Sequence, residues 1–358
     1  MRYGRIWWGS ILMALVLALT VGCGGAETKT PAPAAPAKQP EAAAPAPAPI
    51  EKASVTVAPG PKGGVLWLSE MVAEGTGAFK DQNIDITVLP TPGGNEAAKA
   101  LMAGEADFAL LAFDHVLKNR AQGADLVVVG FLTKDPGLIM VVQNELKGKV
   151  QSIKDLKGQK IGVSSLGGGT HMAVLSLLKK AGMEPTDVEF VAAKDKLGQM
   201  WDAKQISAAM HVDPQITELV GNDKAWILYD FRKSKDTVDL YGTEYPLGTL
   251  VTRQEIIEKK PELVQRMVNA VLAANKFIAT HSAAEVAAKV PAEYKGDSKL
   301  YDQMAKENIE GLAPTLQVSR DSMETVLKEL RDKKVIPADS NVDINSSINM
   351  TFVSKAAK

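Results

Sequence analysis

The stretch Ser164–His171 is the densest group of residues that could contact a small molecule. Its three glycines let the backbone approach a ligand closely. Ser164, Ser165 and Thr170 supply hydroxyls, and His171 supplies an imidazole. A helix expected to begin here would add unpaired N–H groups and the positive end of its dipole. We predict ligand contacts at Ser164, Ser165, Gly169, Thr170 and His171. The alternative is an ordinary turn that caps the helix through Gly169 or Thr170.

Three other places carry candidate ligand-binding side chains. Phe113, Asp114 and His115 stand together after an apolar run, and Asp213 directly precedes Pro214. Capping of a following helix is the alternative role for both aspartates. Trp67 is either an aromatic wall for a planar ligand or a core residue. We predict all five side chains as ligand contacts.

No enzyme signature occurs in the sequence: G-x-S-x-G, the phosphate-binding P-loop and H-E-x-x-H are all absent. The four histidines are widely separated. His115, His171 and His211 could meet in one crevice, but no closely spaced ligand pair supports a metal site. We therefore expect no catalytic residue, no cofactor and no metal.

Short apolar runs alternate with helical segments beyond residue 52. This alternation predicts α/β structure with parallel sheets covered on both faces. In such sheets ligands bind beyond the carboxyl ends of the strands. The expected strands are 54–58, 84–89, 106–112, 126–132, 137–142, 160–164, 188–192, 206–212 and 248–252. The loops selected in this way are 59–64, 113–115, 164–171 and 211–214.

Helices fill the spaces between these strands and dominate the last third of the chain. Pro261 opens a long helix, through about His281, with Leu263, Met267, Val271 and Ala274 on one face. The other expected helices are 65–79, 95–103, 114–122, 153–156, 171–180, a helix from 214, 300–309 and 321–333.

Charge and cysteine content exclude several classes of protein. The formal net charge is −1 and both signs are scattered, so nothing would attract nucleic acid. A single cysteine rules out an intramolecular disulfide, and the folded part must be stabilised by its core. Without its leader and tether, the chain has roughly 300 residues, enough for two lobes.

The N-terminal segment has the pattern of a secretory signal. Arg2 and Arg5 precede an apolar run, Ile6–Leu19, and small residues lead to the lone Cys23. The stretch 19–23 resembles a lipobox, although Thr20 stands where the lipobox prefers leucine. We expect a signal peptide over 1–22, lipidation of Cys23, and an Ala/Pro-rich tether over 23–52. An uncleaved anchor helix over 6–22 is the alternative.

The folded part resembles the periplasmic solute-binding proteins of the nitrate, sulfonate, taurine and thiamine-precursor family. The resemblance covers roughly 53–335 and rests on "GAFKDQNIDITVLPTPGGNEAAKALMAGEADFALLAFDHVLK", "IKDLKGQKIGVSSLGGGTHM", "AAMHVDPQIT" and "EYPLGTLVTRQEIIEKKPELVQRMVNAV". It implies a type II-like two-lobed binding-protein fold, with a mostly parallel, helix-flanked sheet in each lobe. Two strands near 142–150 and 245–251 would cross between the lobes, which close by a hinge.

The same resemblance implies the domain order and the partners. Lobe 1 would span 53–142 and lobe 2 143–249, and 250–358 would return to lobe 1 with C-terminal helices. The protein would be a monomer, lipid-anchored outside the cytoplasmic membrane, that delivers a small solute to an ABC permease. The rival hypotheses are a same-fold enzyme of thiamine- or menaquinone-precursor synthesis and a solute sensor without transport.

The charge of the selected loops bears on the solute. None of them contains arginine, and Asp114 and Asp213 would repel an anion there. We therefore expect a small organic solute (sulfonate-like, zwitterionic or a nitrogen heterocycle) with acceptor atoms at one end and N–H donors or a cation at the other.

The lipid anchor predicts a simple cell-fractionation result. Replacing Cys23→Ser removes the sulfur that would carry the acyl chains, so the protein should leave the membrane fraction or accumulate as an unprocessed precursor. Immunoblots of membrane and soluble fractions measure this. Normal size together with membrane retention in high salt would contradict lipidation.

Overall fold

The computed structural model describes residues 51–60, 63–193, 196–295 and 298–356. These residues fall in one compact unit, Ile50–Lys358. The expected signal peptide, Cys23 and nearly all of the expected tether lie outside the described residues.

The first sheet has the strand order β2-β1-β3-β10-β4. Strands β1, β2 and β3 pair in parallel, whereas β10 is antiparallel to both β3 and β4. Four of the five strands therefore point the same way, and β10 alone is reversed. Their bounds are β1 Ala53–Pro59, β2 Ile84–Val88, β3 Phe108–Ala112, β4 Leu126–Phe131 and β10 Gly248–Arg253.

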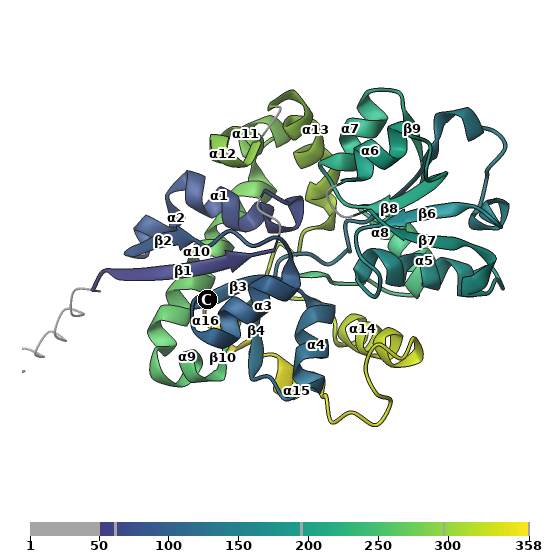
Figure 1. Ribbon diagram of the computed structural model, residues 1–358. Helices are drawn as coiled ribbons and strands as arrows, with labels where there is room; N and C mark the ends of the chain where they lie inside the picture. Colours follow the sequence, from purple (N-terminus) through teal and green to yellow (C-terminus); the bar gives the residue numbers. More distant parts are fainter. Residues whose placement is uncertain (1–50, 61–62, 194–195, 296–297, 357–358) are drawn as a thin grey trace, which may run out of the picture. The chain divides into compact units, whose positions relative to one another are not determined.

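The second sheet repeats this arrangement with the order β7-β6-β8-β5-β9. Strands β6, β7 and β8 pair in parallel, and β5 is antiparallel to β8 and β9. Figure 1 shows the two sheets, with β1, β2 and β3 in one and β6, β7 and β8 in the other. The bounds are β5 Ile139–Gln143, β6 Lys160–Val163, β7 Glu189–Ala192, β8 Ala208–His211 and β9 Ala225–Asp230.

The two-lobed α/β fold class is confirmed, with two differences in detail. Each sheet is mixed, because one strand in each runs against the other four. Strand β5 belongs to the second sheet, so the chain first crosses between the sheets ahead of Ile139 and not at 142–150. The expected domain boundaries stay a prediction.

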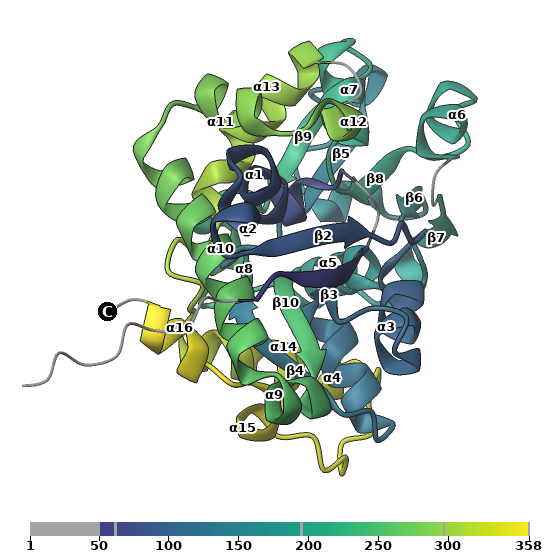
Figure 2. The same ribbon diagram turned by 90° about the vertical axis from the view of Figure 1, so that its left-hand side faces the viewer.

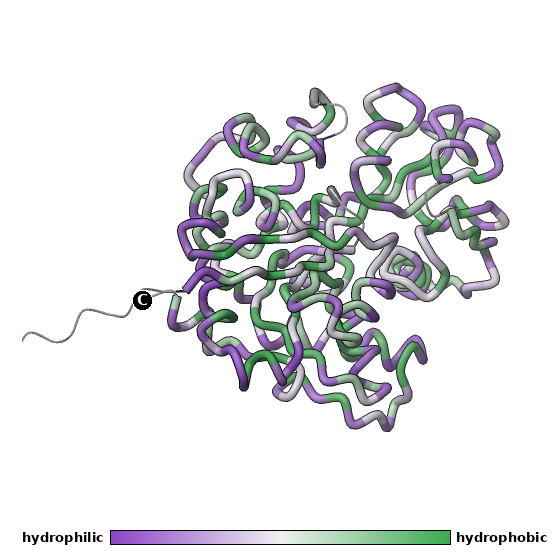
Figure 3. The backbone as a smooth tube through the Cα atoms, turned by 60° about the vertical axis from the view of Figure 1, so that its left-hand side comes forward, coloured by the Kyte–Doolittle hydropathy of each residue, from purple (hydrophilic) through white to green (hydrophobic). Residues whose placement is uncertain are grey.

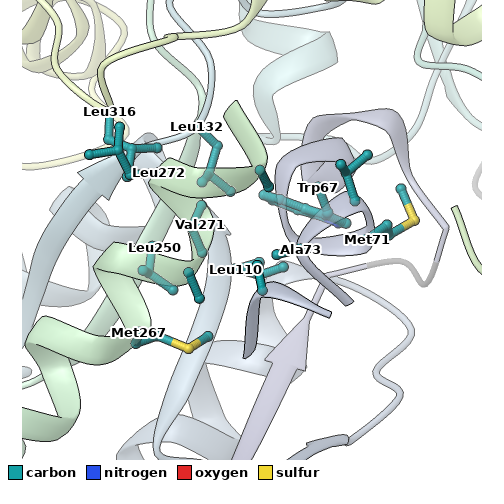
Figure 4. Packing of buried hydrophobic residues seen from close by; sticks show 14 of the residues in the cluster. Trp67, Met71, Ala73, Leu110, Leu132, Leu250, Met267, Val271, Leu272 and Leu316 are labelled. Atoms are coloured by element: carbon teal, nitrogen blue, oxygen red, sulfur yellow. The ribbon is translucent and has the colours of Figure 1, made fainter. Parts of the chain in front are cut away.

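Both faces of the first sheet are covered by helices, because its strands send alternate side chains to two buried clusters. Val57, Leu110 and Leu250 pack with α1 and α10 on one face. Ala109 and Val251, their neighbours along the strands, pack with α3, α4 and α14 on the other. Figure 4 shows Trp67, Met71, Met267 and Val271 in the first cluster, and Figure 2 shows α10 beside β10. These helices are α1 Leu68–Thr76, α3 Gly94–Ala103, α4 Phe113–Ala121, α10 Pro261–Thr280 and α14 Arg320–Asp332.

The long helix α10 matches its sequence pattern closely. Leu263, Met267, Val271 and Ala274 are all buried, as the apolar stripe predicts. The smaller elements around the first sheet are η1 Val65–Trp67, α2 Ala78–Asp81, α9 Gln254–Lys259, α11 Ala283–Lys289, α12 Ala292–Lys295, α13 Ser298–Asn308, η6 Ile309–Gly311, α15 Ile344–Ser347 and α16 Thr351–Ala356.

The second sheet is also covered on both faces. Met140, Ile161 and Met210 pack in the cluster that contains α5 residues, and Ile139 and Ala209 pack with α6 and α7. Figure 3 shows hydrophobic segments concentrated along the inner strands and hydrophilic ones along the outer turns. The helices of this lobe are η2 Asn144–Leu146, η3 Ile153–Leu156, α5 Gly169–Lys180, η4 Pro185–Asp187, α6 Leu197–Asp202, α7 Gln215–Gly221 and α8 Ser234–Tyr241.

Candidate functional site

The clearest candidate site lies where α4 of the first lobe faces the start of α5 in the second. A methyl group added to the Gly169 Cα would lie 3.9 Å from Asp114 Oδ2 and 3.8 Å from Leu247 Cδ1. Asp114 follows β3 and Gly169 follows β6, so the carboxyl ends of two strands from different sheets meet here. Two of the four loops selected from the sequence are therefore brought together.

Asp114 is the polar side chain of this site that most needs a partner. It is only 7% exposed, and its Oδ1 has no hydrogen-bond partner among the described residues. Its position in the first turn of α4 favours the carboxylate through the helix dipole. A buried carboxylate oxygen left without a donor costs about 1–3 kcal/mol or more. The arrangement therefore suits a ligand that donates a hydrogen bond to Oδ1.

Across from Asp114, polar side chains shape the loop 164–171. Thr170 is buried, and its Oγ1 accepts from Ser164 N at 3.0 Å and lies 2.7 Å from Ser164 Oγ. His171 Nδ1 accepts from Gly167 N at 3.1 Å, and its ring meets Phe190 edge-on, with 4.3 Å between ring centroids. Both side chains hold the backbone of the loop in place.

The start of α5 is consequently open to a ligand's acceptor atoms. No side chain of the described residues caps this helix, whose N-cap is Gly168. Its first N–H groups and positive dipole end point toward the side on which Asp114 lies. Burial, and secondarily Lys333, lowers the pKa of His171 below its usual value, so its ring adds no positive charge near pH 7. Acceptor recognition here depends on backbone N–H groups. Ser165, by contrast, is exposed.

Asp213 has a different environment from Asp114. It is 1% exposed, and both of its carboxylate oxygens are used within the protein. Oδ1 accepts from Thr217 N at 3.0 Å and from Thr217 Oγ1 at 2.7 Å. Oδ2 accepts from Arg232 Nη1 at 3.2 Å and from Asn308 Nδ2 at 2.9 Å. Since Asn308 ends α13, whose buried side chains pack in the core of the first lobe, Asp213 joins the two lobes.

Arg232 corrects one step of the sequence argument. We expected no arginine to offset Asp213, but Arg232 does so from the end of β9, a strand that we did not predict. It also forms a bidentate pair with Asp230, 2.7 Å from each carboxylate oxygen. Burial opposes the charge of Arg232, but Asp230 and Asp213 outweigh it and raise its pKa. Repulsion of an anion therefore rests on Asp114 alone.

The other predicted contacts lie away from the Asp114–Gly169 pair. Trp67 is 4% exposed, and its ring packs in the core against Gly60 (Figure 4). Phe113 is fully buried, edge-on to Phe131 with ring centroids 5.2 Å apart. The His115 ring packs over Gly94, where an added methyl group would lie 3.1 Å from Nε2.

Two residues near the site were not predicted: Leu247 and Tyr245. Tyr245 is buried, and its ring stacks on Tyr241 with 4.1 Å between centroids. Burial raises its pKa well above the usual value, and Tyr241 and Asp114 raise it further, so the phenol stays protonated beside the aspartate. The motif "EYPLG", which precedes β10, contains both residues and was the signal available in the sequence.

The comparison with protein families agrees with this architecture. Residues 68–284, more than half of the chain, match the family described as "NMT1/THI5 like". The chain belongs to this family.

Two curated relatives have different kinds of name. One is a binding protein by its name, YtlA of Bacillus subtilis (strain 168), 23% identical over 229 residues, which are 62% of this chain and 66% of the relative. The other is the 4-amino-5-hydroxymethyl-2-methylpyrimidine phosphate synthase THI11 of Saccharomyces cerevisiae, 24% identical over 216 residues, 58% of this chain and 62% of the relative. The chain thus spans less than two thirds of the length of either relative.

Solved structures match over more of their length. A protein of Bordetella bronchiseptica RB50 is 30% identical with a TM-score of 0.74, covering 85% of this chain and 97% of that one. The alkanesulfonate-binding protein SsuA of Xanthomonas axonopodis pv. citri, bound to MOPS, is 18% identical with a TM-score of 0.68, covering 84% and 99%. At this identity SsuA supports the fold alone, which is that of periplasmic binding proteins.

Two further searches concern metals and membranes. Within the described ranges, no three His, Cys, Asp or Glu side chains come together as metal ligands would. None of the helices in those same ranges has both the length and the apolar character needed to cross a bilayer.

The Asp213 cluster predicts a stability result. Asp213→Asn removes a buried charge from Arg232 and weakens the contact with Asn308, so the free energy of unfolding should fall by about 2–3 kcal/mol. Urea denaturation measures it. The matched control is Asp202→Asn, which breaks an exposed pair with Lys224 and should cost under about 1 kcal/mol. Equal effects of the two substitutions would contradict the role of Asp213.

Proposed function

We propose that this protein is an extracytoplasmic solute-binding lipoprotein that holds a small organic solute between its two lobes and delivers it to an ABC importer. The observation that carries the proposal is the buried Asp114 carboxylate, whose Oδ1 lacks a partner among the described residues and which faces the uncapped start of α5. Family membership and the binding-protein fold support it.

The two sides of the site define complementary halves of the solute. Asp114 favours a cationic or N–H donor group, since its free oxygen can only accept while it is ionised. The N–H groups and dipole at the start of α5 favour a carboxylate, sulfonate or other acceptor group. A zwitterion or a polar nitrogen heterocycle satisfies both sides at once. Nitrate or sulfate would satisfy α5 but leave Asp114 unpartnered and repelled.

The relatives are compatible with this solute class. SsuA was solved with MOPS, itself a zwitterion that combines a sulfonate with a protonatable amine. The name of the yeast relative concerns an aminopyrimidine, which is a nitrogen heterocycle. Both classes of compound therefore belong in a binding screen.

A second candidate function is an enzyme that makes a thiamine precursor, because curated relatives at 24% identity are named as synthases. We favour binding, since the polar side chains of the loop 164–171 hold its backbone and the conspicuous free group is one carboxylate. The N-terminal signal pattern and Cys23, if processed, also favour a lipid-anchored protein outside the cytoplasmic membrane, whereas such synthesis is expected in the cytoplasm.

A thermal-shift screen followed by calorimetry tests the proposal. The panel contains taurine, MOPS, a 4-aminopyrimidine, nitrate and sulfate. A zwitterion or the heterocycle should raise the melting temperature, and Asp114→Asn should weaken its binding by about tenfold or more, as expected for a hydrogen bond to a charged group.

The control for this experiment is Asp125→Asn, which alters a largely exposed carboxylate just before β4. It should leave affinity unchanged. Tight binding of nitrate or sulfate, or equal affinity in wild type and Asp114→Asn, would overturn the proposed chemistry.

A further inference from the structure

Helix α5 turns one of its faces toward the first lobe. Met172, Ser176 and Lys179 recur at the spacing that places side chains on one side of a helix. Met172 is buried among the side chains of the first lobe, including Phe113 and Val116. The opposite face, with Ala173, Val174 and Leu177, packs in the core of the second lobe. The helix therefore lies between the two cores.

Ser176 is the polar centre of this face. Its Oγ donates to Glu329 Oε2 at 2.7 Å and accepts from Lys333 Nζ at 2.5 Å. Lys333 also pairs with Glu329, so the three side chains form a closed triangle. Side-chain exposure is only 9% for Lys333 and 15% for Glu329. A peripheral ion pair, Lys179 to Asp332 at 3.2 Å, follows the same line.

The partner helix, α14, belongs to the first lobe. Its buried side chains Val326, Leu327 and Leu330 share a cluster with Val116 and Leu117 of α4. The triangle therefore bridges the lobes, and Figures 1 and 2 both place α14 beside α5.

The charges in the triangle suit a contact that breaks and re-forms. Glu329 and Lys333 are four residues apart on α14, so they can stay paired with each other when α5 moves away. Burial lowers the pKa of Lys333, although Glu329 opposes this effect. Opening would hydrate an intact pair and would leave no charge without a partner. Only the two hydrogen bonds of Ser176 would be lost.

The triangle and the proposed site lie on the same helix. Gly169, at the start of α5, lies near Asp114, and Ser176 is seven residues further on, about 10 Å along the axis. A helix moves as a rigid rod over this length, so seating one end on the first lobe helps to seat the other.

We propose that the Ser176–Glu329–Lys333 triangle is a latch between the lobes, which holds α5 against α14 before a solute arrives and so sets how readily the site closes. The role in solute capture rests on the proposed function. The latch itself is a statement about the lobes alone, and the experiment below needs no solute.

The test is the distribution of distances between nitroxide labels on Asp81 of the first lobe and Thr186 of the second, both exposed, in dialysed full-length protein carrying Cys23→Ser. Double electron–electron resonance measures it. Wild-type Ser176 should give a short-distance population that Ser176→Ala shifts to longer distances. The matched control, Ser207→Ala, removes a hydrogen bond to Gln159 within the second lobe and should change nothing.

Identical distributions in all three proteins would overturn the latch, whether they are short or long. If Ser176→Ala folds poorly, the double variant Glu329→Gln/Lys333→Gln asks the same question, because it removes both charges together. Asp114→Asn should leave the distances unchanged without solute. Failure of the latch and failure of the proposed binding function are therefore distinguished, since only the panel experiment with Asp114→Asn tests the latter.

Discussion

Strand β10 leaves the second lobe and inserts between β3 and β4 of the first sheet, where it is the one strand that runs against its neighbours. Several features of the site depend on this pairing. It fixes Leu247, whose carbonyl accepts from Phe113 N at 2.7 Å, directly ahead of Asp114. It also places the Leu247 side chain beside Gly169. Because β5 occupies the same position in the second sheet, each lobe is completed by a strand next to a crossing, and the two carboxyl edges face a common space.

Two buried aspartates illustrate how similar sequence positions acquire different roles. Asp213 and Asp114 each follow a strand and precede or begin a helix. Asp213 meets Thr217, Arg232 and Asn308, and its charge is used to join the lobes. Asp114 meets the start of α5 with Oδ1 unpaired in the described part of the chain. A buried charge is tolerated when it is compensated, so the fold accounts for Asp213 and a solute donor would account for Asp114.

Local patterns in the sequence predicted most of the strands and helices and half of this site. The apolar stripe of α10 and the strand–helix alternation are short-range signals, and they identified the loops that contain Asp114 and Gly169. The pairing of Asp213 with Arg232, nineteen residues away, depends on β9, whose short run Ala225–Asp230 we did not assign. Trp67 was equally compatible with a core or a ligand wall, because its ring environment includes α10 and β3, far along the chain. Tertiary packing decided these cases.

The central claim is that a small organic solute spans the gap between Asp114 and the start of α5. A crystal structure of the protein grown with the panel compound that most raises the melting temperature tests this claim directly. We predict that a cationic or N–H group of the solute lies within hydrogen-bond distance of Asp114 Oδ1, and that its acceptor atoms lie on the first backbone N–H groups of α5. A solute bound elsewhere, or one that contacts α5 while Asp114 Oδ1 stays unpaired, would contradict it.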